Sequence, residues 1–179
     1  MKKVLYIRHG QSETNIKRVF AGSGDNTPLT DIGREQARKA GQELAGQKID
    51  RIISSPLDRT KETAEIIAME IGFDVSLIQF DSRFLEYDIG SGSGTNIEGM
   101  TAKKMVSFPG AENPDVFAER VKKGLLDVAQ QDGTTLIVSH GGVGRIIECL
   151  RTNHNPAGFY DLQGYPNAHA IELDLSWLQ

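Results

Sequence analysis

The sequence predicts an α/β protein, a three-layer α/β/α sandwich built on a largely parallel sheet. Short apolar runs bounded by polar residues, of which residues 4–7 and 136–138 are the clearest, are typical of buried strands. The segments between such runs carry apolar residues at helical spacing. Strands that alternate with helices favour a parallel sheet covered by helices. A length of 179 residues suits a single core, so we expect residues 1–179 to form one domain.

Five segments are expected to form the strands. In the last of them, residues 170–175, the apolar Ile171 and Leu173 alternate with Glu172 and Asp174, as in a strand that turns one face to water. The remaining expected strands are residues 4–7, 49–54, 75–80 and 136–138.

Capping and turn residues mark where the expected helices begin. Thr30 is suited to cap a helix that reaches about residue 45. Ser55 as N-cap, followed by Pro56 at the first helical position, predicts a second helix start. Two further starts are predicted at Asn113-Pro114 and at Gly141-Gly142.

The composition is that of an ordinary globular protein, with 39% hydrophobic and 25% charged residues. The net charge of −4 excludes a general attraction to nucleic acid or to an anionic membrane, so local arginines have to attract any anionic ligand. The single cysteine, Cys149, excludes an internal disulfide. The apolar run after Met1-Lys2-Lys3 is too short for a signal peptide, and no run is long enough to cross a bilayer. We therefore expect a cytoplasmic protein without nucleic-acid or membrane partners.

Two histidines follow predicted strands directly. His9 comes after the strand at residues 4–7, and His140 comes after the strand at residues 136–138. In open α/β sheets, ligands bind outside the carboxyl ends of the strands, so both side chains are expected at that edge. The glycine after each histidine lets the backbone approach a ligand and direct an N–H at an anion.

Two arginines and a carboxylate complete the candidate site. Arg8 directly precedes His9, and Arg59 lies near the start of a predicted helix, at the positive end of its dipole. Guanidinium forks and a helix N-terminus suit a phosphoryl group. The charge of that group would favour the protonated form of Glu86, which makes Glu86 a candidate proton donor to a leaving alcohol.

Taken singly, each of these residues has an ordinary structural interpretation. A histidine at a strand end is more often a surface or hydrogen-bonding residue than a catalyst. Arg59 alone could pair with Glu62, three residues further along the same helix, and Glu86 alone is a surface carboxylate.

The combination resembles the histidine phosphatase superfamily, the phosphoglycerate-mutase-like proteins. Five elements stand in the order typical of that family, and together they span the chain from about residue 4 to residue 175. They are Arg8-His9-Gly10-Gln11-Ser12-Glu13-Thr14-Asn15, then Gly22 and Asp25 with Pro28-Leu29-Thr30, Ser54-Ser55-Pro56-Leu57-Asp58-Arg59-Thr60, Leu85-Glu86 with Gly90, and Ser139-His140-Gly141-Gly142.

The resemblance implies a phosphoglycerate-mutase-like fold and a displacement in two steps. His9 would attack phosphorus, while Arg8, Arg59 and His140 would bind the phosphoryl oxygens and stabilise the charge of the transition state. Glu86 would protonate the leaving oxygen and then take a proton from the water that cleaves phospho-His9. Further phosphate or substrate contacts are implied for Ser12, Asn15, Gly22 and Gly141. No metal or organic cofactor is implied.

The chain departs from the family pattern after Gly90. Family members commonly have an aromatic-rich connection there that leads to a Glu-Gly pair. In this chain the Ser-Gly repeat of residues 90–94 intervenes, Glu98-Gly99 comes later, and the aromatic residue is absent. The four core roles are unaffected, but the wall that faces the substrate is not carried over from the family. We expect residues 90–94 to form a flexible loop beside the site.

Hydrolysis of a small phosphorylated metabolite is the favoured function, and three alternatives stay open. Mutases of this family are longer, with added segments that cover the substrate, so a phosphoglycerate mutase is less favoured. A metal hydrolase using His9, His140, Glu86 and another histidine would need metal-ligand spacing, and the His pair at i and i+4 that is typical of zinc helices does not occur. A non-catalytic phospho-ligand binding protein is the third alternative. The half-exposed strand at residues 170–175 could pair across a homodimer.

Overall fold

A central sheet of five strands organises the computed structural model, which describes residues 2–178. The strand order is β3-β2-β4-β1-β5. The pairs β1–β4, β2–β4 and β2–β3 are parallel, and β5 pairs antiparallel with β1. The strands are β1 (Lys2–Arg8), β2 (Arg51–Ser54), β3 (Gln79–Phe80), β4 (Gly133–Ser139) and β5 (Ala170–Glu172).

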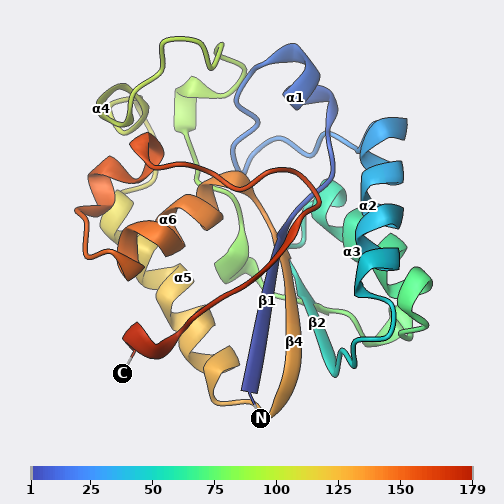
Figure 1. Cartoon of the computed structure of the whole chain (residues 1–179). Helices are drawn as coiled ribbons and strands as arrows, with labels where there is room; N and C mark the ends of the chain where they lie inside the picture. Colours follow the sequence, from blue (N-terminus) through green and yellow to red (C-terminus); the bar gives the residue numbers. More distant parts are fainter. Residues whose placement is uncertain (1, 179) are drawn as a thin grey trace.

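Helices cover both faces of this sheet (Figure 1). The pair α2 and α3 lies on one face, and the pair α5 and α6 lies on the other, which confirms the predicted three layers. The α-helices are α1 (Glu13–Lys17), α2 (Asp31–Leu44), α3 (Asp58–Ile71), α4 (Ala102–Met105), α5 (Pro114–Ala129) and α6 (Gly141–Arg151). Short 3-10 turns occupy Val75–Leu77, Ser82–Phe84, Gly90–Gly92, Pro156–Asp161 and Ser176–Leu178.

The alternation of side chains along the central strands explains why there are two cores. In β1, Leu5 and Ile7 pack with α2 and α3, whereas Val4 and Tyr6 pack with α5 and α6. Both sets are buried, so the strand reads as a continuous apolar run, as expected for a parallel sheet covered on both sides. The carboxyl ends of β1 and β4 point to the end of the molecule that carries α1 and α4 (Figure 1).

One predicted strand is largely wrong. Within residues 75–80, only Gln79 and Phe80 pair as a strand, and Val75–Leu77 form a 3-10 turn. The Asp74 side chain accepts hydrogen bonds from the backbone N–H and the hydroxyl of Ser76, at 2.9 and 2.7 Å. This local cap stabilises a turn, and it outweighs the β-propensity of an apolar run at the sheet edge.

The start of the helix at residue 55 was also predicted wrongly. The N-cap of α3 is Leu57 and the helix begins at Asp58, three residues after Ser55. The Ser55 hydroxyl lies 2.7 Å from Nε2 of His140 instead of capping the helix. The helix starts capped by Thr30 and by Asn113, with Pro114 in the first turn, are confirmed.

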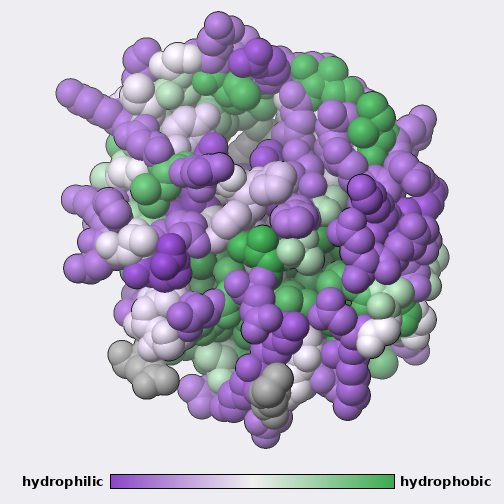
Figure 2. Space-filling model, in the orientation of Figure 1, coloured by the Kyte–Doolittle hydropathy of each residue, from purple (hydrophilic) through white to green (hydrophobic). Residues whose placement is uncertain are grey.

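The remaining sequence predictions differ from the structure mainly in length. The expected strand at residues 170–175 ends at Glu172, although the Leu173 N–H still donates to the Val4 carbonyl at 2.9 Å. The Ser-Gly repeat forms a 3-10 turn at Gly90–Gly92. Hydrophilic side chains cover most of the face seen in Figure 2, and hydrophobic ones gather toward its middle, over the sheet. None of the helices within residues 2–178 has the length and apolarity needed to span a membrane.

Candidate active site

The ends of two adjacent strands bring the two histidines together. His9 follows β1, and its N–H donates to the Ser139 carbonyl at the end of β4, at 2.9 Å. His140 follows β4 directly and is the N-cap of α6. The two imidazole rings face each other edge to face, with centroids 5.4 Å apart. The parallel pairing of β1 with β4 therefore produces the expected juxtaposition.

The Gly10 carbonyl fixes the tautomer of His9. Its Nδ1 lies 2.7 Å from the carbonyl oxygen of Gly10, which can only accept, so Nδ1 carries the proton. Burial, together with the charges of Arg59 and Arg8, holds the pKa of His9 well below its usual value of 6.5. The ring is therefore neutral near pH 7, and Nε2 keeps its lone pair.

Arg59 reaches the site from the first turn of α3. Its side chain is only 1% exposed. The guanidinium donates to the carbonyls of Asp25 and Gly22, at 2.6 and 3.1 Å. Glu62 pairs instead with Arg34, which excludes the structural interpretation of Arg59 as its partner. A buried cation held by two carbonyls keeps its charge available to an anion.

Arg8 is placed by the end of β1 and by a glycine opposite. Its Nη1 donates to the Tyr165 carbonyl at 3.2 Å. A Cβ at Gly141 would lie 3.3 Å from Nε and Cζ of Arg8, so glycine lets the guanidinium pack against the start of α6. Among residues 2–178, the buried side-chain atoms without a hydrogen-bond partner are Arg8 Nε and His140 Nδ1. Because such atoms are costly to leave unsatisfied, an oxyanion that accepts from them would be stabilised.

His140 lies beside His9 and is fully buried. Burial, with the charge of Arg59, holds the pKa of His140 well below its usual value of 6.5. The Ser55 hydroxyl fixes the ring through Nε2, at 2.7 Å. Ser55 thus orients His140, whereas the sequence pattern had indicated a helix cap.

Glu86 meets the N-terminus of α6. Its Oε2 accepts from the Gly142 N–H at 3.2 Å, and its Oε1 accepts from the Tyr87 N–H at 2.9 Å. A Cβ at Gly142 would lie 2.1 Å from Oε1, so only glycine leaves room for the carboxylate. Two backbone donors and a helix N-terminus thus fix the carboxylate beside the arginines.

Arg8, His9, Arg59 and Glu86 line one cavity of about 290 Å³, whereas His140 is not among its lining residues. Four arginines line it, together with a single carboxylate, Glu86, so its charge is strongly positive although the protein carries −4 overall. This agrees with the expectation that local arginines attract an anionic ligand. The lining arginines are Arg8, Arg18, Arg59 and Arg145.

The minor contacts expected from the sequence are only partly brought to this cavity. Asn15, Gly22 and Gly141 line it. Ser12 does not: it is fully buried as the N-cap of α1, and its hydroxyl lies 3.0 Å from the hydroxyl of Thr14. A direct phosphate contact by Ser12 therefore finds no support in this geometry.

An aromatic and cationic part of the cavity wall was not expected from the sequence. Phe20 and Tyr160 pack edge to face, with centroids 5.5 Å apart, and Arg145 lies 4.5 Å above the Tyr160 ring. Nε of Arg145 donates to the Leu162 carbonyl at 3.0 Å, and no carboxylate within residues 2–178 forms an ion pair with this guanidinium. The sequence did hold a signal for Arg145, which follows Gly141 by one helical turn and so shares its face of α6.

A resident metal finds no ligand set in the described part of the chain. Within residues 2–178, no group of three or more His, Cys, Asp or Glu side chains is placed to hold an ion. The two other histidines of the chain, His154 and His169, do not line the cavity, so neither supplies the further ligand that the metal alternative needs.

The comparisons with known proteins identify the family. The profile of the histidine phosphatase superfamily (branch 1) matches residues 4–176. The protein belongs to that superfamily. A probable phosphoglycerate mutase GpmB of Salmonella choleraesuis is 36% identical to it over an alignment of 155 residues, which covers 79% of this chain and 70% of the relative.

Solved structures of other proteins share the fold. A mycobacterial glucosyl-3-phosphoglycerate phosphatase, solved as a complex with VO3, superimposes with a TM-score of 0.80 at 21% identity, over 97% of this chain and 93% of the other. A phosphoserine phosphatase of Entamoeba histolytica, in complex with 3-phosphoglyceric acid, gives a TM-score of 0.80 at 24% identity, over 96% and 90%. These likenesses establish the histidine phosphatase fold.

Proposed function

We propose that this member of the superfamily is a phosphatase that hydrolyses a small phosphomonoester through a phosphohistidine at His9. The observation that carries the proposal is the state of His9: a neutral imidazole, protonated at Nδ1, beside the guanidinium groups of Arg8 and Arg59. Such a ring has one free lone pair, at Nε2, and two cations next to it that attract a phosphoryl group.

In the first step, Nε2 of His9 attacks phosphorus and the bond to the leaving oxygen breaks. Arg8, Arg59 and His140 stabilise the negative charge on the phosphoryl oxygens. The carboxyl group of Glu86 delivers its proton to the leaving oxygen, which departs as an alcohol.

In the second step, water attacks the phosphorus of phospho-His9 and the P–N bond breaks. The Glu86 carboxylate, now ionised, takes a proton from that water, and inorganic phosphate leaves. The enzyme returns to its starting state, so each cycle consumes one water and one phosphomonoester. None of these steps uses a metal or an organic cofactor.

The shape of the cavity supports a small, partly apolar substrate. One part of the cavity wall combines the aromatic rings of Phe20 and Tyr160 with the Arg145 guanidinium. We propose that the organic part of the substrate packs on these rings, and that Arg145 receives a second acidic group where the substrate carries one. A volume of about 290 Å³ suits a metabolite rather than a macromolecule.

The test is a phosphate-release screen over a panel of phosphorylated metabolites, with His9→Ala as the blank. Wild-type enzyme should release phosphate, and a brief reaction with ³²P-labelled substrate should yield an acid-labile label on the protein that His9→Ala does not acquire. Turnover of phosphomonoesters by His9→Ala at the wild-type rate would contradict the mechanism.

A mutase is the second candidate, because the GpmB relative named above is called a probable phosphoglycerate mutase. Hydrolysis is favoured by the two phosphatases named among the similar structures. Incubation with 3-phosphoglycerate separates the two functions. We expect free phosphate, whereas formation of 2-phosphoglycerate with little phosphate release would identify a mutase.

A further inference from the structure

The segment that carries Glu86 has no regular secondary structure of its own. It leaves the 3-10 turn Ser82–Phe84 and runs irregularly past the end of β4. A strand or helix would fix Glu86 through its backbone ladder, but here the backbone oxygens need other donors. A proton donor has to be held within hydrogen-bond reach of the leaving oxygen, so whatever fixes this segment governs its chemistry.

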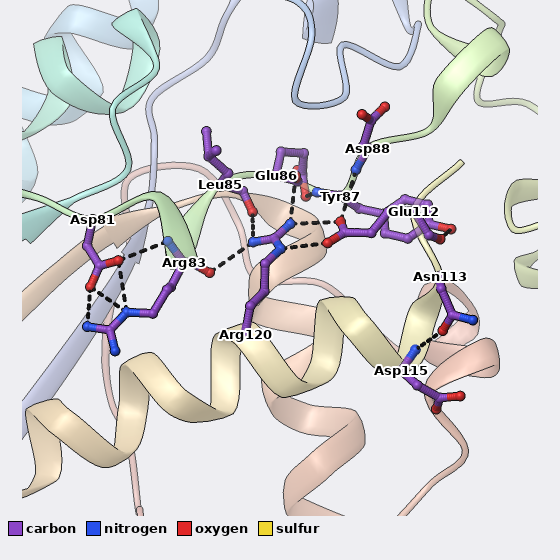
Figure 3. A network of polar contacts seen from close by, with 10 residues as sticks. All are labelled: Asp81, Arg83, Leu85, Glu86, Tyr87, Asp88, Glu112, Asn113, Asp115 and Arg120. Carbon is purple, nitrogen blue, oxygen red and sulfur yellow. Dashed lines mark hydrogen bonds and ion pairs between the residues drawn. The ribbon is translucent and has the colours of Figure 1, made fainter. Parts of the chain in front are cut away.

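One side chain supplies most of those donors. Nη1 of Arg120, on α5, donates to the carbonyls of Arg83 and Leu85, at 2.9 and 2.8 Å, and Nη2 donates to the Glu86 carbonyl at 3.1 Å. The Phe84 carbonyl between them accepts from the Ser139 hydroxyl at 2.8 Å. Four consecutive carbonyls are thus bound by side chains, and Figure 3 shows Arg120 reaching up from α5 to three of them.

Arg120 is itself held on two sides. Glu112 accepts from its Nε and Nη2, at 2.7 and 2.9 Å, in a bidentate pair that is mostly buried. The ring of Phe117, one turn earlier on α5, lies 4.6 Å from Cζ of the guanidinium. A fork fixed in this way is preorganised, and a lysine cannot reproduce its geometry.

The partner of Arg120 also holds the far side of the segment. The Glu112 N–H donates to the Asp88 carbonyl at 2.8 Å, and the Glu112 carbonyl accepts from the hydroxyl of Tyr87. Arg120 and Glu112 therefore form hydrogen bonds to the chain on both sides of Glu86 and connect this segment to the start of α5 (Figure 3). By contrast, the side chain of Arg83 points away from the site and pairs with Asp81 and Asp127.

From this geometry we infer that Arg120, braced by Glu112, is a positioning residue for the proton donor Glu86. It does not line the cavity, so it acts through the backbone of the Glu86 segment and not on the substrate. The inference rests on the proposed function, because it gives Glu86 the role of general acid.

The experiment compares leaving groups. The value of kcat/KM reports the step in which the leaving oxygen departs, and phenyl phosphate needs a proton there, whereas 2,4-dinitrophenyl phosphate does not. In Arg120→Lys and in Glu112→Gln, we expect kcat/KM for phenyl phosphate to fall by about 10- to 100-fold, part of the contribution of a general acid. The value for 2,4-dinitrophenyl phosphate should stay within about threefold of wild type.

Two further variants calibrate this result. Glu86→Gln should show the full selective loss on phenyl phosphate, and the Arg120 and Glu112 variants should lie between it and wild type. Arg83→Gln is the matched control, since it removes an arginine from the same segment whose side chain makes no contact with Glu86. Its ratio of the two kcat/KM values should equal that of wild type.

The ratio of the kcat/KM values for the two substrates is informative even when a variant folds poorly, because both rates scale with the amount of folded enzyme. An equal loss on both substrates would assign Arg120 a purely structural role and overturn the inference, as would no loss on either. Failure of the proposed function would look different: His9→Ala would still hydrolyse 2,4-dinitrophenyl phosphate at the wild-type rate.

Discussion

Substitution of Gly142 by alanine should lower the activity without lowering the stability of the fold. In Gly142→Ala, the new Cβ would lie 2.1 Å from Oε1 of Glu86, whereas ordinary van der Waals contact begins near 3.4 Å. The carboxylate therefore has to retreat by about 1.3 Å, and its 3.2 Å hydrogen bond to the residue 142 N–H is disturbed as well. Misplacement of a catalytic group by about 1 Å can cost roughly 100-fold in rate.

The fold should tolerate the same change. The atom that has to move is the end of a flexible side chain, and residue 142 lies in the first turn of α6, where alanine favours the helix over glycine. We expect kcat/KM for an alkyl phosphomonoester such as glycerol phosphate to fall by about 100-fold, with the free energy of unfolding unchanged or slightly higher. Steady-state kinetics and urea denaturation of the same preparation measure the two quantities.

Gly158→Ala is the matched control, because a Cβ at Gly158 meets nothing within 4 Å. It should leave kcat/KM at the wild-type value. If Gly142→Ala hydrolysed glycerol phosphate as fast as wild type, Glu86 would not need the position that the structure gives it, and the assignment of Glu86 as proton donor would be refuted.

Three other predictions concern charge. In the unfolded chain a histidine binds a proton below a pH of about 6.5, whereas the lowered pKa values keep His9 and His140 neutral in the folded protein. The free energy of unfolding should therefore fall as the pH drops below about 6.5, by up to about 1.4 kcal/mol per pH unit for each histidine. Urea titrations at several pH values should show that the free energy of unfolding of His140→Asn falls less steeply with decreasing pH than that of wild type. Equal slopes for the two proteins would contradict the burial of a neutral His140 ring. Arg59→Met should weaken competitive inhibition by vanadate by about 10- to 100-fold, which is the effect of losing one or two charged hydrogen bonds. The control Arg38→Met, which replaces an exposed arginine of α2, should leave the inhibition constant unchanged. Arg145→Ala should raise KM for 3-phosphoglycerate by about tenfold and leave KM for glycerol phosphate unchanged, because only the former offers a carboxylate to the lost guanidinium; an equal rise for both would remove Arg145 from substrate selection.

The centre of the site could be predicted because short-range rules place it. A buried apolar run ends at Arg8 and another ends at Ser139, and parallel strands deliver the residues that follow them, His9 and His140, to the same edge. Nothing about this step requires knowledge of side-chain packing. The family motif then supplied Arg59 and Glu86, which come from a helix start and an irregular segment.

The parts that could not be predicted are those decided by distant contacts. The sequence at Ser55 has the pattern of a helix cap, but the hydroxyl is used by His140, which lies 85 positions further along the chain. The aromatic wall joins Phe20 to Tyr160, from opposite ends of the sequence, and no local pattern relates them. Arg120 looks like a charged residue on the solvent face of α5 until the fold brings the Glu86 segment over it.

The chemical groups and the substrate wall are built on different parts of the fold. Strand ends and helix starts hold His9, Arg59 and His140, whereas the aromatic part of the wall, Phe20 and Tyr160, lies in a loop and a 3-10 turn. Substitutions in the loops can thus accumulate without disturbing the sheet that aligns the reacting atoms. An evolving lineage, or a protein engineer, could therefore reshape the aromatic wall of the cavity while the sheet keeps His9 and His140 in place.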